Sequence, residues 1–354
     1  MRNSKIEQEL TGSVVMVTGG AGFIGTGIVR QLMNYDVKQI IVLDDSVSHL
    51  QDLTAKFPTP VLSRLKLIPG NVKNEQQMRN IFSEYRPWIV FHAAGYQNIA
   101  FMENFPFYSL EVNIFGAKIM ADLSGEYRVK RFINLSSDVA LNPVSIMGAS
   151  KRIGEMYIQA LAQTKKYPTR FASVRFGNLA TPSSAALQLL EKQIGHGGPV
   201  TIPVKNARFW LTSLEETVRL ILQAAFMGNN GKLFSLALGE SVTYYDLAVN
   251  TIVAYGYEPH KQIEIRITGE PEDEKLYNEP DYPEEILKPT AHPQIREEKR
   301  LSIDYATLNR QINKLLGTLD DQNLNELIEQ MMYIVPEYIS HNKGFSDGGS
   351  KSTC

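Results

Sequence analysis

Cysteine is almost missing from this sequence: Cys354, the last of the 354 residues, is the only one. A single cysteine allows neither an intramolecular disulfide nor a thiolate cluster that binds a metal. The six histidines also lack the spacing of a metal-binding cluster, so no metal site is predicted. This composition is typical of a protein of a reducing compartment.

Long hydrophobic runs are missing too. The first ten residues contain no apolar segment of the kind found in signal peptides. No apolar run approaches the roughly 18 residues that a membrane-spanning helix needs. We therefore expect a soluble, cytoplasmic protein that has no membrane partner.

The sequence also lacks an excess of charge of either sign. The formal net charge is -2, and no run of five or more basic residues occurs. Binding to a nucleic-acid backbone requires a positive field, so no nucleic-acid partner is expected. Hydrophobic residues make up 43% of the chain and charged residues 21%, which is ordinary for a globular protein with a large core.

What the sequence does contain is a glycine-rich turn between a strand and a helix. The apolar segment 13–18 is followed by Gly19-Gly-Ala-Gly22-Phe23-Ile24-Gly25, and Ile28 and Leu32 then continue the apolar pattern at helical spacing. Glycine lets the backbone come close to a pyrophosphate, which the free amides at the start of the helix can bind. The pattern predicts a dinucleotide-binding turn; the alternative is a tight turn that binds no nucleotide.

An acidic pair at the end of the second strand indicates which dinucleotide is bound. The strand 39–43 ends at Asp44, which follows the glycine turn by about 20 residues, where an acidic group binds the ribose 2'-hydroxyl. Asp44 and Asp45 would repel a 2'-phosphate, and no arginine lies beside them to bind one. We therefore predict NAD, in preference to NADP.

Strands and helices then alternate through the first half of the chain. Further strands are expected at 65–68, 88–94, 131–136 and 170–175, with helices at 75–85, through 112–123 and from about 147 to 165. This alternation predicts an α/β fold with a doubly wound parallel sheet, Rossmann-like, that binds ligands at the carboxyl ends of its strands.

The expected domain organisation follows from where this pattern loosens. We predict an NAD-binding domain over 12–178 and a smaller C-terminal α/β substrate-binding domain over 179–335, with the chain able to cross back between them. Residues 270–287 are rich in acidic residues and proline, as in a solvated loop. The tail 341–354 is predicted to be disordered.

Several segments together resemble an extended short-chain dehydrogenase/reductase. They are Thr18-Gly-Gly-Ala-Gly-Phe-Ile-Gly25, Phe91-His-Ala-Ala-Gly-Tyr96, Asn113, Met147-Gly-Ala-Ser-Lys151 and Arg175-Phe-Gly-Asn178. Further segments are similar to the polysaccharide-biosynthesis branch that contains the UDP-N-acetylglucosamine 4,6-dehydratases: Met102-Glu103, Asn142-Pro143, Gly197-Gly-Pro-Val200, Arg208-Phe209 and Glu274-Lys-Leu-Tyr277. The resemblance covers roughly residues 12–295 and is specific as a set.

The resemblance implies a nucleotide-diphosphate sugar substrate and a bound NAD(P). In this branch the sugar C4 hydroxyl is oxidised, which acidifies the C5 proton. Water is then lost across C5 and C6, and the hydride returns to C6. Each step requires an acid or base within hydrogen-bond reach of the reacting atoms.

Two departures from the branch affect proton transfer. Most relatives have Tyr-x-x-x-Lys, but this chain has Met147 at the tyrosine position, and a thioether cannot transfer a proton. Some members of the dehydratase branch also have methionine there, and a Ser/Thr-Asp-Lys run then supplies the acid and base. Here Val139 stands at that lysine position.

Other polar positions of the branch are also replaced. Tyr96-Gln97-Asn98 stands where relatives have Ala-Tyr-Lys-His. Gly269-Glu-Pro-Glu-Asp-Glu-Lys275 stands where they have an arginine that would bind the diphosphate of the substrate. Diphosphate binding would then depend on Arg208 and on the region around Asn178.

The candidate site residues each have a functional and a structural interpretation. The catalytic candidates are Ser137, Asp138, Met147, Lys151 and Tyr96. Asp138 is the best acid/base candidate but could only cap a turn, Tyr96 could supply the missing phenol or only line the pocket, and Lys151 could approach the nicotinamide ribose or be a solvated helix lysine. His92 lies in an apolar strand and is expected to be a buried, hydrogen-bonded histidine.

The predicted binding residues form two groups. The cofactor-binding residues are Gly19, Gly22, Phe23, Ile24, Gly25, Asp44, Asp45, Asn71, Val72, Ala93, Ala94, Gly95, Asn113 and Lys151. The substrate-binding residues are Glu103, Asn178, Arg208 and Glu274, of which Glu103 could instead cap a helix or form an ion pair.

These residues leave three functions open. The first is NAD-dependent 4,6-dehydration of a nucleotide-diphosphate sugar, with UDP-N-acetylhexosamine as the expected class. The second is epimerisation or net oxidation of such a sugar, and the third is a binding protein that retains the NAD and sugar-nucleotide sites without turnover. A homo-oligomer is expected by resemblance, because relatives often pair through helices that flank the active site.

Overall fold

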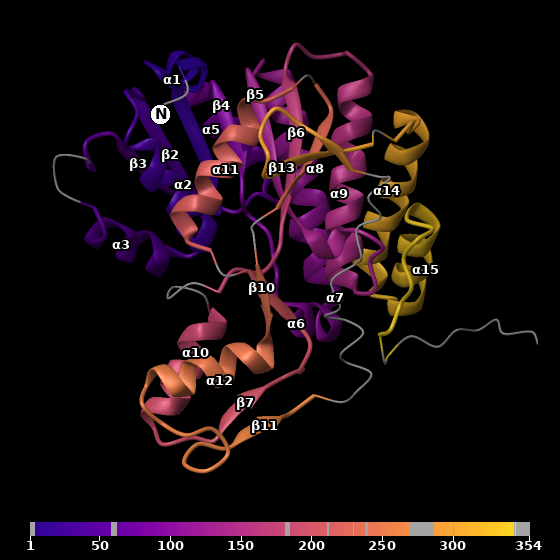
Figure 1. Ribbon diagram of the computed structural model, residues 1–354. Helices are drawn as coiled ribbons and strands as arrows, with labels where there is room; N and C mark the ends of the chain where they lie inside the picture. The colour runs from indigo at the N-terminus through magenta and orange to yellow at the C-terminus, as the bar shows by residue number, and fades with distance from the viewer. Residues whose placement is uncertain are drawn as a thin grey trace, which may run out of the picture.

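The computed structural model describes residues 4–57, 62–180, 185–210, 212–228, 230–237, 240–269, 287–299, 301–342 and 344. Within these ranges, a nine-stranded sheet runs through the larger part of the molecule (Figure 1). Its strands are β1 (Val14–Thr18), β2 (Gln39–Asp44), β3 (Leu65–Pro69), β4 (Ile89–His92), β5 (Arg131–Ser137), β6 (Arg170–Phe176), β9 (Lys232–Leu236), β12 (Leu287–Pro289) and β13 (Ile295–Glu298).

The strand order confirms the predicted doubly wound α/β fold. The order is β12-β13-β9-β6-β5-β4-β1-β2-β3, and the neighbours from β9 to β3 pair in parallel, whereas β13 and β12 pair antiparallel. β1 pairs with β2 on one side and with β4 on the other, so the direction of winding reverses there. Ligands of such sheets bind at the carboxyl ends of the strands beside this reversal.

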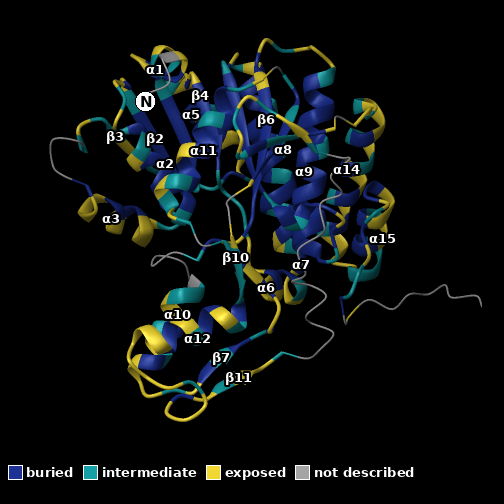
Figure 2. Cartoon of the chain, viewed as in Figure 1, coloured by how far each residue is buried: buried dark blue, intermediate teal, exposed yellow. Residues whose placement is uncertain are grey.

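Helices cover both faces of the sheet. On one face, α1 (Ser4–Leu10), α2 (Phe23–Leu32), α3 (Val47–Ala55) and α11 (Leu214–Phe226) bury their apolar residues in one cluster with β1 and β6. On the other face, α5 (Glu75–Tyr85), the π-helix η1 (Ser109–Gly116), α8 (Ala117–Glu126) and α9 (Ile146–Gln163) contribute to a second cluster. The strands β1, β2, β4, β5, β6 and β9 are accordingly buried through most of their length (Figure 2), whereas the edge strands β3 and β12 contain no buried residue. The apolar strands expected from the sequence therefore lie between two helical layers.

The segment expected as one long helix through 112–123 is divided. α6 (Ile99–Asn104) and α7 (Pro106–Tyr108) precede η1, and α8 follows it. The side chain of Asn113, within η1, accepts a hydrogen bond from the backbone N–H of Tyr96 at 2.9 Å and donates to its carbonyl at 3.1 Å. The π-helical turn thus places a side-chain amide against the loop that follows β4, a feature that helical periodicity alone does not reveal.

A smaller unit lies below the carboxyl ends of the parallel strands (Figure 1). It contains α10 (Ala185–Gly195), β7 (Val200–Ile202), β8 (Arg208–Trp210), β10 (Ser241–Thr243), α12 (Tyr244–Ala254) and β11 (Ile265–Ile267), which share an apolar cluster of their own. Between these elements the chain returns to the large sheet, since α11 packs on α2 and β9 pairs with β6. Segment 179–335 is therefore shared between the two parts, and the boundaries at 178 and 335 stay predictions.

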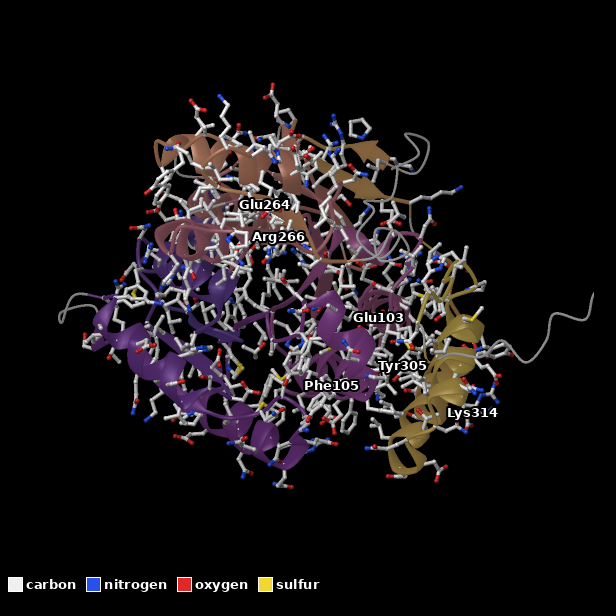
Figure 3. All side chains as sticks on the ribbon, turned by 90° about the horizontal axis from the view of Figure 1, so that it is seen from below. Glu103, Phe105, Glu264, Arg266, Tyr305 and Lys314 are labelled. Carbon is white, nitrogen blue, oxygen red and sulfur yellow. The ribbon has the colours of Figure 1, made fainter. Side chains whose placement is uncertain are left out.

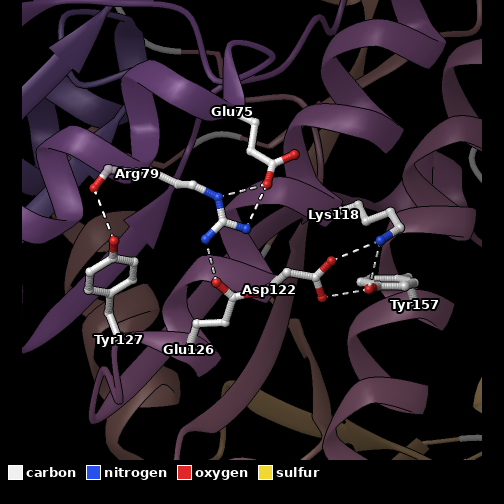
Figure 4. A network of polar contacts seen from close by, with 7 residues as sticks. All are labelled: Glu75, Arg79, Lys118, Asp122, Glu126, Tyr127 and Tyr157. Atoms are coloured by element: carbon white, nitrogen blue, oxygen red, sulfur yellow. Dashed lines mark hydrogen bonds and ion pairs between the residues drawn. The ribbon is translucent and has the colours of Figure 1, made fainter.

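Two C-terminal helices pack beside α9. They are α14 (Tyr305–Asp321) and α15 (Leu324–Ile334), whose residues Leu308, Ile312 and Ile328 join the cluster that α8 and α9 form. The Tyr305 ring lies 5.8 Å from the Tyr157 ring of α9. Figure 4 shows how Tyr157 is fixed from the other side: its hydroxyl donates to Asp122 of α8 at 2.6 Å. The helix that carries Lys151 is thus held from several sides.

Candidate functional site

A narrow cavity lies against the glycine turn at the carboxyl ends of β1, β2 and β4. Its volume is about 270 Å³. Its lining includes the predicted cofactor residues Gly19, Gly22, Asp44, Asp45, Asn71, Val72, Ala93, Ala94 and Gly95, together with Leu43, His49, Gly70, Tyr96 and Val112. The structure therefore gathers residues from four separate turns around one space.

The backbone of the glycine turn leaves no room for side chains. Gly19 has a φ of 60°, and a Cβ there would lie 2.7 Å from the backbone of Ala94. A Cβ on Gly25 would lie 2.1 Å from the Gly19 carbonyl oxygen. Gly22 precedes α2 without a capping side chain, so the first amides of that helix remain available to an anion. These are the properties that a pyrophosphate-binding turn requires.

Asp44 supports the glycine turn as well as lining the cavity. Its side chain is 7% exposed, Oδ2 accepts a hydrogen bond from the Ala21 N–H at 3.0 Å, and Oδ1 accepts one from the Ser46 N–H at 3.1 Å. Asp45 is exposed and accepts from the side-chain amide of Asn71 at 3.4 Å. Both carboxylates lie where a 2'-phosphate would meet negative charge.

Lys151 is buried near the inner end of this cavity. A Cβ on Gly95 would lie 2.5 Å from its Nζ and 2.9 Å from Asn113 Oδ1, so glycine at 95 allows both side chains to approach the loop after β4. Burial lowers the pKa of Lys151 to about 8, while Glu155 acts in the opposite direction. A lysine with this pKa can bind or release a proton near neutral pH. Lys151 is buried, so it is not the solvated helix lysine of the alternative interpretation.

A second, larger cavity separates the sheet from the smaller unit. Its volume is about 490 Å³. It is lined by Phe23, Ile24, Gln97, Asn98, Ile99, Ser137, Val139, Met147, Phe176, Gly177, Asn178, Leu179, Ala186, Leu189, Pro203, Ala207, Phe209 and Tyr244. Most of this lining is apolar, and its polar side chains come mainly from the ends of β4, β5 and β6.

The two replaced proton-transfer positions lie together in the second cavity. Met147 is 2% exposed and packs in a small apolar cluster with Ile99 and Met102, against which Val139 and Tyr96 also pack. Where a tyrosine and a lysine would bring polar atoms, this chain brings a thioether and two methyl groups. The wall of the cavity at this point is therefore apolar.

Asp138 and Ser137 follow this wall at the end of β5. Asp138 begins a 3-10 turn, η2 (Asp138–Ala140), and is 5% exposed. Its backbone carbonyl accepts the N–H of Leu141 at 3.0 Å, so its main chain closes the turn while its side chain faces Gly177. Ser137 lines the cavity. Asp138 is thus the carboxylate nearest to the replaced positions along the chain.

Tyr96 lines the first cavity and is half-buried. Burial raises its pKa, and the negative charge of Asp45 raises it further. A phenol with a raised pKa is a weaker source of phenolate, which makes Tyr96 a poor substitute for the missing tyrosine. Its role as the catalytic phenol stays a prediction.

Glu103, near the end of α6, lies against the start of α9 and accepts hydrogen bonds from other residues of the protein. Its carboxylate accepts a hydrogen bond from the Ile146 N–H at 2.7 Å and another from the Asn342 side chain at 2.7 Å. Burial raises the pKa of Glu103, although these hydrogen bonds oppose the shift. In the view of Figure 3, Glu103 is drawn on the side of the molecule where α14, which carries both Tyr305 and Lys314, lies. Its position matches the capping alternative.

The remaining predicted substrate residues are spread around the smaller unit. Asn178 is exposed and lines the second cavity. Arg208 is exposed on β8, and its Nε donates to the Ser241 hydroxyl at 2.7 Å. Glu274 lies outside the described residues. Substrate binding by these three residues stays a prediction.

Comparisons with known proteins place the chain in a family. A family model described as "Polysaccharide biosynthesis protein" matches residues 15–300. The chain belongs to this family.

One relative of this family member is a longer protein. The capsular polysaccharide biosynthesis protein CapD of Staphylococcus aureus is 34% identical over 292 residues, which are 82% of this chain and 47% of CapD. The chain thus spans about half the length of CapD.

Solved structures share the fold of this polysaccharide biosynthesis family member. Pen from Bacillus thuringiensis has a TM-score of 0.71 at 22% identity, with 86% of this chain and 99% of Pen covered. The UDP-glucose 4-epimerase of Thermus thermophilus, in complex with NAD, has a TM-score of 0.62 at 21% identity, with 73% and 88% covered. At these identities the likeness establishes a common fold.

Sequence reasoning missed two residues of the site. Trp210 directly follows Arg208-Phe209, one of the segments similar to the branch, and lies beside Gly177. The structure alone reveals this contact. Asn342 belongs to the segment predicted as a disordered tail, yet it is 9% exposed and binds Glu103. Only the side-chain chemistry of Asn342, an amide with two donors, could have suggested such a contact.

One histidine of this family member is structural, and a third cavity lies apart from the site. His92 is buried, its Nδ1 lies 2.8 Å from the Thr18 hydroxyl, and burial lowers its pKa to about 3, as expected for a structural histidine. Among the described residues, no group of His, Cys, Asp and Glu has the arrangement of a metal site, and no helix could cross a membrane. A depression of about 750 Å³ lies at the opposite, amino ends of the strands, near Trp88 and Arg170.

Proposed function

We propose that this protein binds NAD and uses it to modify a nucleotide-diphosphate sugar, with UDP-N-acetylhexosamine as the substrate class. The observation that carries the proposal is the pair of neighbouring cavities at the carboxyl ends of the strands. The narrow one adjoins a glycine turn with no room for side chains. The wide one is lined by Ser137 and by Gly177, against which the carboxylate of Asp138 lies. Enzymes of this kind bring a dinucleotide and a sugar nucleotide together across such a boundary.

The residues of the narrow cavity fit NAD. The Gly19 and Gly22 backbone and the first amides of α2 would hold the pyrophosphate. Asp44 and Asp45 would lie near the adenosine ribose and disfavour a 2'-phosphate, which supports NAD over NADP. Lys151 and Asn113 lie against Gly95 of the narrow cavity, where they would approach the nicotinamide ribose. When bound, NAD supplies a hydride acceptor that returns the hydride later in the cycle.

The residues of the wide cavity would then handle protons. Asp138 would accept the proton of the sugar hydroxyl that is oxidised, with Ser137 available to pass it on. Lys151, with its lowered pKa, would hold positive charge beside the nicotinamide. The resemblance adds 4,6-dehydration through a C4-keto intermediate as the expected reaction; it would also require Asp138 to accept the C5 proton and to return a proton to the hydroxyl that leaves C6 as water.

The presence of valine at position 139, in place of the lysine of the branch, supports a second class of reaction. A base for the C5 proton is missing at this position, and the surrounding wall of Ile99 and Met147 is apolar. Oxidation at C4 followed by return of the hydride does not need that base. Epimerisation or net oxidation of the same substrate class is therefore the alternative, and loss of turnover with retained binding is the alternative of another class.

Mass spectrometry distinguishes these reactions. The purified protein is incubated with NAD and with a panel of UDP- and dTDP-linked sugars, and the nucleotide sugars are separated by chromatography that resolves isomers before their masses are measured. Loss of one water supports dehydration, an isomer of unchanged mass supports epimerisation, and NADH formed in proportion to product supports net oxidation. Unchanged substrates throughout would contradict all three reactions and leave the binding protein.

Two variants complete the experiment. Asp138→Asn should reduce any turnover by about 100-fold or more, the contribution expected of a general base, while NAD affinity measured by calorimetry is retained. Val139→Lys restores the lysine of the branch. If it creates dehydration in an otherwise inactive protein that binds NAD, the binding-protein alternative is supported for the wild type.

A further inference from the structure

The indole N–H of Trp210 is buried and has no hydrogen-bond partner among the described residues. An indole nitrogen can only donate, and a buried donor without an acceptor destabilises the folded protein. Trp210 belongs to β8 of the smaller unit, but its ring packs against the apolar cluster of the large sheet. The side chain therefore joins the two parts of the molecule while its polar atom is left unused.

Gly177 brings this N–H close to a specific acceptor. A Cβ at residue 177 would lie 2.1 Å from Trp210 Nε1 and 2.8 Å from Asp138 Oδ2. Both atoms thus face the same small space above Gly177, which any larger residue would fill. The absence of a side chain at 177 is what leaves the indole and the carboxylate next to one another.

The backbone fixes Trp210 in this place. Its N–H donates to the Asn178 carbonyl at 2.7 Å, and its carbonyl accepts from the Ala180 N–H at 3.0 Å. These bonds tie residue 210 to the segment that follows Gly177. The position of the indole beside Asp138 is therefore set by the backbone of the segment that carries Gly177.

We propose that Trp210 is a positioning residue for Asp138, with its indole N–H donating to the carboxylate across Gly177. The inference rests on the proposed function, in which Asp138 accepts the substrate proton. A hydrogen bond to one carboxylate oxygen leaves the other directed at the substrate and stabilises the ionised form that a base requires. Because Trp210 belongs to β8, the bond also couples Asp138 to the unit that closes the wide cavity.

The indole N–H can be observed directly by NMR. The chain has two tryptophans, so protein with ¹⁵N-labelled tryptophan gives two indole signals, and Trp88→Phe identifies that of Trp210. We expect the Trp210 proton signal to lie downfield and to move upfield in Asp138→Ala. Asp320→Ala, which removes an exposed carboxylate of α14, serves as the matched control and should leave the signal unchanged. A Trp210 signal that Asp138→Ala does not move would overturn the proposal.

A kinetic cycle tests the positioning role independently. Trp210→Phe keeps the ring and removes the donor, and should lower kcat about tenfold, as expected for a hydrogen bond to a charged group, with the KM for NAD unchanged. In the Asp138→Asn background the same substitution should have little further effect. Equal losses in both backgrounds would contradict the proposal. If no sugar nucleotide is turned over, the NMR result still decides on the bond, so the two proposals fail separately.

Discussion

At the scale of single residues, Lys151 shows how burial changes the pKa of a charged side chain. Its ammonium group has no hydrogen-bond partner among the described residues, and burial alone explains the direction of its pKa shift. The sequence predicted a functional lysine here from its resemblance to a family. It could not predict the pKa, because desolvation depends on the loop after β4 and on η1, which pack around it.

This burial predicts a pH dependence of stability. The lysine loses its proton near pH 8 in the folded protein but only near 10.5 in the unfolded chain. Between these values the unfolded chain binds more protons, so raising the pH stabilises the folded state, by an amount on the order of 3 kcal/mol. The free energy of unfolding of the wild type relative to Lys151→Met, measured by urea denaturation, should rise from pH 8 to 10.5. A flat difference would show that Lys151 is not desolvated.

Met147, in contrast to Lys151, contributes only packing, because its side chain carries no ionisable group. It is buried with Ile99 and Met102 and cannot transfer a proton. Met147→Leu conserves volume, so turnover should stay within about twofold and the free energy of unfolding within about 1.5 kcal/mol. Met147→Ala, as the comparison, should cost about 2–5 kcal/mol. A large loss of turnover in Met147→Leu with normal stability would instead indicate a role for the sulfur.

At the scale of elements, the start of α9 is held by two other parts of the chain. Glu103 of α6 accepts the N–H of Ile146, and Asn342, beyond α15, donates to both the side chain and the carbonyl of Glu103. The Ile339 N–H also donates to the Pro143 carbonyl in the loop before α9. The segment that links Asp138 to Lys151 is therefore clamped at its midpoint.

Loss of this clamp should loosen the loop before it unfolds the protein. Glu103→Ala leaves the Ile146 N–H and the Asn342 amide without their acceptor, at a cost of about 1–3 kcal/mol. Hydrogen exchange of residues 141–151 should accelerate more than that of β1 or β2. Glu329→Ala, on the exposed side of α15, is the control and should change neither. Uniform acceleration over the whole sheet would argue against a local clamp.

The elements also show which parts of the fold follow from sequence. α5 lies where its apolar spacing predicted, at 75–85, and the strand before Asp138 was placed within one residue, because each has a strong local pattern. The π-helix η1 and the position of β9 in the large sheet do not follow from the sequence. The π-helix depends on how Asn113 packs, and the position of β9 depends on its pairing with β6. The glycine turn was predictable, whereas the clamp on Glu103 joins residues 239 positions apart.

At the scale of the whole molecule, a buried cluster of charges holds together elements distant in sequence. Arg175 of β6 donates from Nε to Glu155 of α9 at 2.6 Å and forms an ion pair with Glu298 of β13 at 2.7 Å. Arg152 forms a further ion pair, in which its Nε lies 3.0 Å from Oε1 of Glu337, a residue that follows α15. The side chains of Arg175 and Glu155 are fully buried, so water does not screen their interaction.

Breaking this cluster should destabilise the whole molecule. Arg175→Met removes the closer counter-ion of Glu155 and Glu298 and leaves them only the longer contacts with Arg152, at 3.4 and 3.8 Å. It should cost about 3–5 kcal/mol, measured by denaturant unfolding. The control is Arg266→Met, which removes an exposed pair with Glu264 on the smaller unit (Figure 3) and should cost less than about 1 kcal/mol. Similar losses in the two variants would show that the cluster adds nothing beyond surface pairing.

The C-terminal helices bear on how copies of the chain could associate. Leu308, Ile312 and Ile328 belong to helices that pack on α9 and cover apolar surface there that would otherwise be available to a second copy. A homo-oligomer that pairs through α9 would first have to displace α14 and α15. The expected homo-oligomer therefore stays a prediction, and its interface would have to use another surface.

The positions of the two tryptophans give the molecule a built-in optical probe. Trp88 lies at the amino ends of the strands, far along the sheet from Trp210 beside the wide cavity. Tryptophan emission overlaps the absorption of reduced nicotinamide but not that of the oxidised form. With NAD bound as proposed, energy transfer from Trp210 in a Trp88→Phe background would rise when a hydride reaches the cofactor. The fluorescence of one side chain would then record each half of the redox cycle without any added label.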